Sequence, residues 1–322
     1  MAQGCKHHNC WPLDTGCNIE GELDYHQCKH WQAEDKQRTE SSVDHTTEQN
    51  LPWHGNSFGT TDLLFVTGRS QLVVGIVGGQ DAGKTTFLSS FYLLLSKRSS
   101  LPSRSFAGSY TLGGWENIAH YLRWDGDNPP AFPLHTTSEQ SRIPGLLHIA
   151  FRNNQAKHHD VLFSDAPGEW FSRWAIDKHD STVEGARWVE RFASGFLLFV
   201  DCEALAGNNR GIARVDLKNL LHQLGSSVHN RPVAVIWAKS DVVISDSTRV
   251  SLQKELQTTL KNYKEFAVYA APKDIGAENR GEGVLDSVEW LLNSILIQKH
   301  PAIRIAPVVD SHSFLAYRGS GI

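Results

Sequence analysis

The feature that most constrains this chain is a glycine-rich loop placed between an apolar run and an amphipathic segment. Residues 72–79 read LVVGIVGG, and residues 78–85 match the pattern G-x-x-x-x-G-K-T in full. The apolar run is rich in β-branched side chains and predicts a buried strand. The residues from Thr85 to Arg98 predict an amphipathic helix, whose apolar side carries Phe87, Leu88, Phe91, Leu94 and Leu95. Because a strand–loop–helix unit presents backbone N–H groups to an anion, we predict a phosphate-binding loop.

The residue types in this loop suit the parts of a nucleoside triphosphate. Glycine at positions 78 and 83 lets the backbone wrap around phosphate oxygens. We expect the Lys84 ammonium to reach the β- and γ-phosphates and the Thr85 hydroxyl to bind Mg²⁺. The predicted contacts to the nucleotide are Gly78, Gly79, Gln80, Asp81, Ala82, Gly83, Lys84, Thr85 and Thr86.

Further along the chain, more segments have the pattern of strands. They are residues 146–153, 159–170, 194–205, 231–241 and 266–274, and residues 281–296 follow with an apolar helical stripe. This order of strands and helices predicts a three-layer α/β sandwich with a mostly parallel sheet across residues 61–300. The nucleotide is then expected at the carboxyl ends of the strands.

Two of the predicted strands end in short motifs. Residues 165–168 read DAPG, and residues 238–241 read AKSD. Together with the loop GGQDAGKT, this order resembles TRAFAC-class P-loop GTPases with a Ras-like core, and the loop is similar to that of dynamin-like GTPases. The resemblance implies that Asp165 holds Mg²⁺ through a water and that the Gly168 N–H senses the γ-phosphate. It also implies that the strand at 146–153 runs antiparallel to its neighbour.

The resemblance further implies a guanine pocket, with one departure from the family pattern. Lys239 and Asp241 would contact the base, because a carboxylate accepts hydrogen bonds from guanine N1 and N2. Ala238 stands where the family has Asn or Thr, which weakens the expectation of guanine selectivity. In the loop APKD, the Ala271 N–H would lie near guanine O6. The alternative for Lys239 and Asp241 is that they are ordinary charged residues of a loop, and the alternative for APKD is a simple turn.

Lys84 and Asp165 are 81 positions apart, a long interval for a small Ras-like GTPase. We expect a helix near residues 114–124 in this interval. We also expect a switch I threonine that meets both Mg²⁺ and the γ-phosphate. The candidates are Thr137 and Thr136, with Thr111 and Ser109 as rivals.

Lys84 and the switch I candidate Thr137 are expected to take part in catalysis, and three further residues are candidates for it. Glu169 follows DAPG, where many relatives have Gln or His to orient the attacking water. A carboxylate there polarises water but repels the γ-phosphate, so we expect slow hydrolysis, and the alternative is an ordinary helix-start Glu. Asp81 stands where cation-dependent GTPases have Asn or Asp, which implies stimulation by K⁺. Arg173 is either an internal arginine finger or a surface arginine lying over a neighbouring tryptophan.

A narrower resemblance comes from residues 106–119, FAGSYTLGGWENIA, together with the loop and the cysteine-rich amino terminus. These segments resemble GTPases of bacterial conflict and anti-phage operons in the double-GTPase group. The resemblance implies a second GTPase chain and an effector protein as partners. The function that follows is a GTP-binding, slowly GTP-hydrolysing switch. A non-hydrolysing nucleotide-binding scaffold and a P-loop ATPase remain alternatives, because Glu169 and Ala238 each replace a standard contact.

Four cysteines in the first 28 residues are spaced C-x4-C-x6-C-x10-C. A reducing compartment favours metal binding over disulfides, so residues 1–31 are predicted to form a small Zn²⁺-binding segment. The predicted ligands are Cys5, Cys10, Cys17 and Cys28. A reduced cysteine-rich tail and a redox switch are the alternatives.

The remaining segments and the composition complete the expectations. Residues 32–60 read as a linker or arm that Phe58 would pin to the main domain, and residues 301–322 form a tail without an assigned role. A net charge of −4 excludes a basic coat, so general binding of nucleic acid is not expected. No apolar run approaches the ~18 residues of a membrane span, and the first residues lack a signal-peptide core, so we expect a cytoplasmic protein.

Overall fold

The computed structural model describes residues 55–60, 62–63, 71–98, 100–123, 131, 144–269, 281 and 283–299. Several predicted features lie outside these residues. They are the four cysteines Cys5, Cys10, Cys17 and Cys28, the switch I candidates Thr136 and Thr137, Ala271, and the tail at 301–322.

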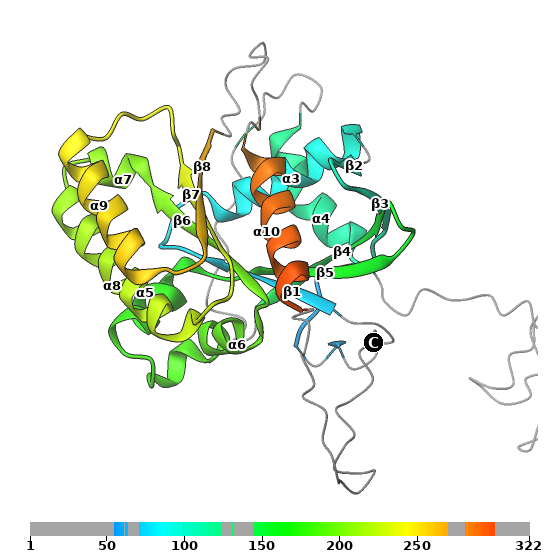
Figure 1. Cartoon of the computed structure of the whole chain (residues 1–322), viewed down its shortest axis with the longest axis horizontal. Helices are drawn as coiled ribbons and strands as arrows, with labels where there is room; N and C mark the ends of the chain where they lie inside the picture. Colours follow the sequence, from blue (N-terminus) through cyan, green and yellow to red (C-terminus); the bar gives the residue numbers. More distant parts are fainter. Residues whose placement is uncertain are drawn as a thin grey trace, which may run out of the picture. The chain divides into compact units, whose positions relative to one another are not determined.

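One sheet of eight strands organises the described residues (Figure 1). The strands are β1 Gln71–Val77, β2 Ser100–Leu101, β3 Arg104–Gly108, β4 Gly145–Asn153, β5 His158–Asp165, β6 Gly195–Asp201, β7 Val233–Ala238 and β8 Tyr263–Val268. Their order is β2-β3-β4-β5-β1-β6-β7-β8. The strands from β5 through β1, β6 and β7 to β8 pair in parallel. The pairing of β4 with β5 is antiparallel, as expected for residues 146–153.

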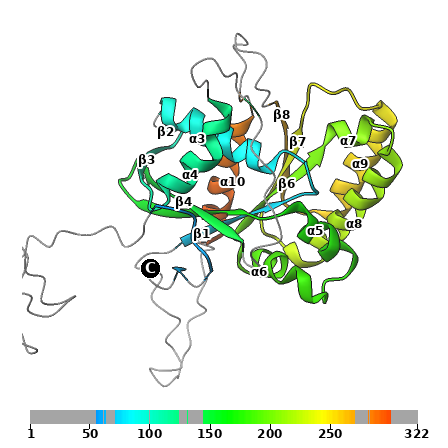
Figure 2. The same ribbon diagram turned by 180° about the vertical axis from the view of Figure 1, so that it is seen from behind.

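Helices cover both faces of this sheet (Figures 1 and 2). They are α3 Lys84–Arg98, α4 Leu112–Ala119, α5 Gly168–Ile176, α6 Glu184–Phe192, α7 Cys202–Ala206, α8 Arg210–Val228, α9 Asp246–Thr259 and α10 Val284–Lys299. Buried side chains of α3, α4 and α10 form one apolar core, and those of α5 to α9 form the other. The fold is therefore the predicted three-layer arrangement with a mostly parallel sheet.

Strand β1 shows why the sequence folds in this way. Leu72, Val74 and Ile76 are buried in the core on the α3 side, whereas Val73 and Val77 are buried in the core on the α5 side. Successive side chains of a strand point to opposite faces, so a continuous apolar run serves a strand that is covered on both faces.

The long interval between Lys84 and Asp165 contains an extension of the sheet. Strands β2 and β3 pair antiparallel and continue the sheet beyond β4. Helix α4 lies in the predicted helical region and buries Trp115 against the core on the α3 side. The buried Arg104 of β3 pairs with Glu289 of α10 at 2.8 Å, which ties the extension to a helix near the end of the described chain.

Several predicted boundaries were wrong, for local reasons. The strand predicted at 194–205 ends at Asp201, because the Asp201 carboxylate caps helix α7 by accepting from the N–H groups of Glu203 and Ala204. The strand predicted at 159–170 ends at Asp165, where the chain turns into α5. The strand predicted at 266–274 begins earlier, as β8 Tyr263–Val268.

The expectation for Phe58 is confirmed. Phe58 is buried and exchanges backbone hydrogen bonds with Leu146, at 2.9 Å and 2.8 Å, so this part of the arm is pinned to β4. Cys202 is a free cysteine in the core.

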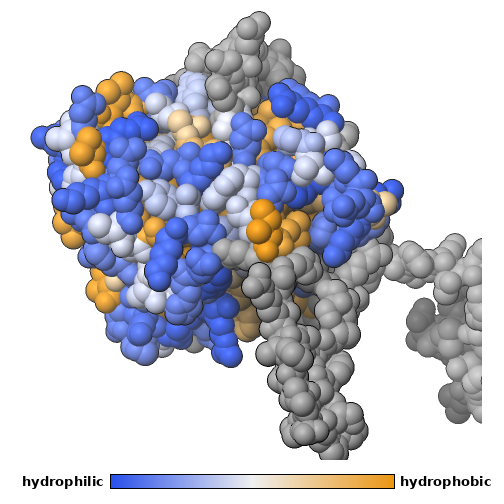
Figure 3. Space-filling model, viewed as in Figure 1, coloured by the Kyte–Doolittle hydropathy of each residue, from blue (hydrophilic) through white to orange (hydrophobic). Residues whose placement is uncertain are grey.

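In the view of Figure 3, hydrophilic residues cover most of the coloured surface and apolar residues appear as separate spots. Among the described helices, none combines the length and apolar character needed to cross a membrane.

Candidate nucleotide-binding site

The loop between β1 and α3 is already shaped as a phosphate-binding loop. Asp81 and Gly83 have positive φ angles of 57° and 82°, the left-handed conformation in which glycine is favoured. A Cβ on Gly78 would lie 2.8 Å from the Phe199 side chain, so a larger residue does not fit there. The glycines at both ends of the loop are thus explained by backbone geometry and close packing.

The side chain of Lys84 folds back under the loop and bonds to its backbone. Its Nζ donates hydrogen bonds to the carbonyl oxygens of Gly78 at 3.2 Å and Gly79 at 2.6 Å. The residue is only 7% exposed, and burial lowers the pKa of its ammonium to about 8, although Asp165, Asp81 and Asp201 act in the opposite direction. A buried cation that is under-compensated by nearby charge gains from a bound anion. Lys84 is thus placed to interact with phosphate.

Two oxygen atoms beside Lys84 fit a magnesium ion. The Thr85 hydroxyl donates to Asp165 Oδ1 at 3.3 Å, which brings the loop and the end of β5 together. Among the described residues there is no group of three or more His, Cys, Asp or Glu side chains arranged to hold a metal. Mg²⁺ is usually bound by one or two carboxylates together with substrate phosphates and water. A hydroxyl and a carboxylate next to a phosphate-binding loop fit that chemistry.

The DAPG segment contacts the phosphate-binding loop directly. A Cβ added to Gly168 would lie 2.3 Å from Gly79 O and 2.4 Å from Gln80 N, so the start of α5 packs against the loop backbone. Only glycine allows this approach. The structure therefore brings Asp165 and Gly168 to the loop, as the sequence predicts.

The side chain of Glu169 is 41% exposed in the first turn of α5. Its carboxylate lies 3.8 Å from Arg173 Nη2, one turn further along the helix. Arg173 also donates to the Thr182 hydroxyl at 3.4 Å. This pairing is typical of a helix surface.

The base-recognition candidate Lys239 lies at the carboxyl end of β7 and has a positive φ of 54°. Its Nζ contacts Asp201 Oδ2 at 2.9 Å and Glu203 Oε2 at 2.8 Å. Burial alone would lower the pKa of Lys239, but the hydrogen bonds to Glu203 and Asp201 raise it above its ordinary value. The sequence did not predict that Asp201 and Glu203 contact Lys239. The one available signal is Asp201 itself, an aspartate at the end of an apolar strand where it can cap the following helix.

The loop after β7 is held beside the phosphate-binding loop. The Ser240 N–H donates to Val268 O at 3.2 Å, which joins the loop to the end of β8. The Ala238 Cβ lies 3.9 Å from the position of a Cβ on Gly83. Asp241 is exposed in the turn that follows. The AKSD and GGQDAGKT segments are thus neighbours, as a common nucleotide site requires.

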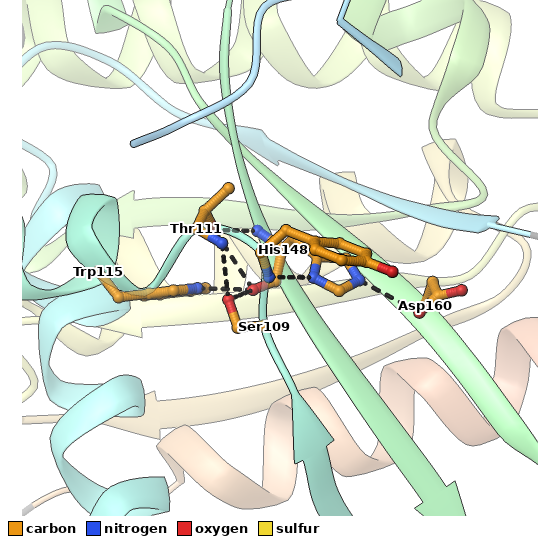
Figure 4. A network of polar contacts seen from close by, with 6 residues as sticks. Ser109, Thr111, Trp115, His148 and Asp160 are labelled. Carbon is orange, nitrogen blue, oxygen red and sulfur yellow. Dashed lines mark hydrogen bonds and ion pairs between the residues drawn. The ribbon is translucent and has the colours of Figure 1, made fainter. Parts of the chain in front are cut away.

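The two rival switch I residues are used in a different way. Ser109 donates to His148 O at 2.6 Å, and the His148 N–H donates to the Thr111 hydroxyl at 2.8 Å (Figure 4). Trp115 Nε1 also donates to His148 O, at 2.9 Å. His148 Nδ1 accepts from the Tyr110 N–H at 3.0 Å. These contacts fasten the β3–α4 connection to β4, a structural role that the sequence did not reveal.

Comparison with known proteins gives a family and distant structural neighbours. A crystal structure of a nucleolar GTP-binding protein 1 from Plasmodium falciparum aligns at 13% identity and a TM-score of 0.41, over 72% of this chain and 90% of that chain. A RocCORdC structure of Methanosarcina barkeri Roco2 bound to GDP aligns at 16% identity and a TM-score of 0.36, over 75% of this chain and 52% of that chain.

No curated protein matches the sequence. The family model described as Double-GTPase 2 matches residues 72–291, which include the phosphate-binding loop, the DAPG segment and the AKSD segment. With that match covering most of its length, the chain belongs to the Double-GTPase 2 family.

Proposed function

We propose that this chain binds GTP together with Mg²⁺ and hydrolyses it slowly, as a molecular switch. The observation that carries the proposal is the closed phosphate-binding loop, with the buried Lys84 inside it and the Thr85–Asp165 oxygen pair beside it. Membership of the Double-GTPase 2 family supports guanine nucleotide as the ligand.

The residues of the loop would divide the work of holding the phosphates. Lys84 would lie against the phosphate oxygens, and the backbone N–H groups of residues 78–86 would surround them. Thr85 and Asp165 would hold Mg²⁺, which supplies charge neutralisation on the phosphates when it is bound. The Gly168 N–H would read the presence of the γ-phosphate, and its contact with the loop backbone supports a coupling between the phosphates and α5.

For hydrolysis we propose Glu169 as the residue that orients water, with Thr137 as the switch I threonine. Asp81 would help to hold a K⁺ ion near the phosphates. The pairing of Glu169 with Arg173 supports a slow reaction, because the carboxylate must leave this partner before it orients water. Exchange of Glu169 for Gln tests the assignment. A wild-type rate of single-turnover hydrolysis in this variant removes Glu169 from the mechanism, and equal rates in K⁺ and Na⁺ buffers remove the potassium ion.

For base recognition we propose Lys239, Asp241 and Ala271. The position of Lys239 beside the phosphate-binding loop supports its part in the site. Asp241 would accept hydrogen bonds from guanine N1 and N2. Because Ala238 offers no side-chain hydrogen bond, we expect weaker discrimination against other bases than a complete motif gives.

The wider setting of the switch is also part of the proposal. We propose a second GTPase chain or an effector protein as partner, a cytoplasmic location and a part in anti-phage defence. A structural Zn²⁺ on Cys5, Cys10, Cys17 and Cys28 would fold the amino-terminal segment. Metal analysis after purification without chelators tests the zinc, and less than about half an equivalent per chain rejects it.

Two other functions each have an observation in their favour. The Glu169–Arg173 pair suits a nucleotide-binding scaffold that does not hydrolyse. The replacement of the usual Asn or Thr by Ala238 suits an ATPase with weak base selectivity.

The deciding experiment is a titration of fluorescent GTP and ATP analogues, followed by measurement of phosphate release. Wild type should bind the GTP analogue more tightly, and Lys84→Ala should lose at least about tenfold in affinity, as for removal of a buried charge contact. Lys97→Ala is the matched control, because Lys97 is an exposed lysine in the last turn of the same helix. Equal affinity for both bases rejects the GTPase, and tight binding without release favours the scaffold.

A further inference from the structure

The pairing between β1 and β5 changes character just before the nucleotide site. Regular register pairs run from Gln71–Asp160 to Val74–Phe163. Beyond them, the Ile76 N–H donates to the side-chain oxygen of Ser164 at 2.9 Å. At this point a serine hydroxyl takes the place of a backbone carbonyl between the two strands.

Ser164 lies in apolar surroundings. It is fully buried, as are Ile76, Val74 and Phe163 around it. A buried backbone N–H must have a partner, since leaving it unpaired costs as much as a lost hydrogen bond. Ser164 is the one residue of β5 with a hydroxyl group, and this hydroxyl is the acceptor that pairs the buried Ile76 N–H.

The position of this hydrogen bond gives it a functional meaning. Ile76 is two residues before Gly78, where the phosphate-binding loop begins, and Ser164 directly precedes Asp165. The bond therefore sets the distance between the strand that carries the loop and the strand that carries Asp165. Asp165 Oδ1 lies 3.3 Å from the Thr85 hydroxyl at the end of these two strands.

We propose that Ser164 is a positioning residue that holds Asp165 in place for Mg²⁺, an inference that rests on the proposed binding of Mg²⁺ and GTP. The Ser164 hydroxyl does not touch the nucleotide; it acts through the separation of β1 and β5. Without it, the end of β5 shifts until the Ile76 N–H finds another partner, and Asp165 moves away from Thr85.

The test compares Ser164→Ala with two other variants. Ser164→Thr keeps the hydroxyl. Ser287→Ala removes another fully buried serine, whose hydroxyl donates to Val284 O at 2.8 Å within α10, and it serves as the matched control. For each protein, the Mg²⁺ concentration for half-maximal binding of a fluorescent GTP analogue is measured. The affinity for a fluorescent GDP analogue in EDTA is measured alongside it.

We expect Ser164→Ala to need about tenfold more Mg²⁺ than wild type, the size of effect set by one lost buried hydrogen bond. Its GDP affinity in EDTA should stay within about twofold of wild type, because the Asp165 carboxylate would contact the nucleotide only through the metal. Ser164→Thr and Ser287→Ala should keep the wild-type Mg²⁺ requirement. If Ser164 has a purely structural role, Ser164→Ala should lose equal amounts of nucleotide affinity with and without Mg²⁺, and that result overturns the proposal.

Two further outcomes separate this proposal from the function on which it rests. A wild-type requirement for Mg²⁺ in Ser164→Ala, with normal GTP binding in wild type, overturns the role of Ser164 alone. Absence of any nucleotide binding in wild type overturns both. If Ser164→Ala does not fold, the proposal is tested by hydrogen exchange of the backbone amides in wild type. The hydrogen bond predicts that the Ile76 amide exchanges as slowly as that of Val74. Much faster exchange at Ile76 overturns the hydrogen bond and the proposal.

Discussion

At Lys84, burial and negative charge act in opposite directions on one ammonium group. Its folded pKa of about 8 lies below the ordinary 10.5, so the unfolded chain holds more protons between these values. The contribution of Lys84 to the free energy of unfolding therefore rises with pH across this window. Below about pH 8 the buried group is charged, which is the form that attracts phosphate.

A proton measurement follows from this pKa. Bound phosphate favours the charged ammonium, so we expect uptake of about half a proton on nucleotide binding at a pH equal to the pKa, and almost none two units lower. Titration calorimetry in two buffers with different ionisation enthalpies measures the uptake. Lys84→Arg, whose guanidinium stays charged, should lack this uptake at both pH values and show only the protons exchanged by the nucleotide phosphates. Equal uptake by wild type at both pH values would contradict the assigned pKa.

Gly168 gives a second prediction at the scale of one residue. Gly168→Ala places a methyl group against the backbone of Gly79 and Gln80, at 2.3–2.4 Å. We expect a loss of about 1–3 kcal/mol in the free energy of unfolding, as for overpacked sites, together with weaker binding of the GTP analogue. Urea denaturation and titration measure the two effects.

The control for this substitution is Gly211→Ala in helix α8. An added Cβ there has no neighbour within 4 Å. Alanine favours a helix over glycine, so stability should stay the same or rise by up to about 1 kcal/mol. A Gly168→Ala protein as stable as the control would show that the start of α5 is not packed closely against the phosphate-binding loop.

At the residue scale, the sequence indicates those parts of the candidate site that are contiguous in the chain. The phosphate-binding loop and the DAPG segment could be predicted to lie together, because glycines, Lys84 and Asp165 stand at fixed spacings after apolar strands. The carboxylates of Asp201 and Glu203 were not found, because their contact with Lys239 comes from a neighbouring strand end, 38 and 36 positions away.

At the scale of elements, the ion pair between β3 and α10 is the clearest test of how the sheet extension is attached. The side chains of Arg104 and Glu289 are 4% and 10% exposed, and Arg104 also donates to Asn293 Oδ1 at 2.6 Å. Glu289→Ala leaves the guanidinium charge buried and without its carboxylate. We expect a loss of about 3 kcal/mol or more in the free energy of unfolding.

Chemical denaturation measures this loss, with Lys218→Ala as the comparison. Lys218 pairs with Glu255 at 3.3 Å but its side chain is 36% exposed, so its removal should cost less than about 1 kcal/mol. Similar losses in the two variants would show that the extension is not held by the buried pair.

Element prediction depended on how apolar each segment is. The central strands were found because both of their faces are buried, which requires continuous apolar runs. The start of β8 was placed too late because Tyr263 and Glu265 are polar and partly exposed, and Lys264 is polar and exposed. The small β2–β3 pair was missed, since a two-residue strand leaves hardly any pattern to detect.

At the scale of the whole molecule, the candidate nucleotide site joins the ends of β1, β5, β6 and β7, which form the middle of the sheet. A ligand held there should stabilise the domain as a unit. We expect Mg²⁺ with GTP analogue at a hundred times its Kd to add about 2.7 kcal/mol to the free energy of unfolding. Thermal unfolding followed by circular dichroism should show a higher midpoint in wild type and a smaller shift in Lys84→Ala at the same ligand concentration, about 1.4 kcal/mol or less for an affinity that is at least about tenfold weaker. A ligand-induced shift of the same size in Lys84→Ala would place binding elsewhere.

The layered architecture could be predicted because strands alternate with helices and each apolar run matches its place in the sheet. The way the extension docks could not, because Arg104 and Glu289 are 185 positions apart and nothing local marks either as a partner. Long-range polar pairs of this kind are set by tertiary packing and not by periodicity.

The order of the strands also has a consequence for synthesis of the chain on the ribosome. Strand β1 is made before its two neighbours, β5 and β6, which end at Asp165 and Asp201. Its apolar residues therefore remain without sheet partners while a further hundred or so positions are translated, and such non-local pairing is slow. We expect the nascent chain to engage chaperones in this interval, when the strand that carries the phosphate-binding loop is still uncovered.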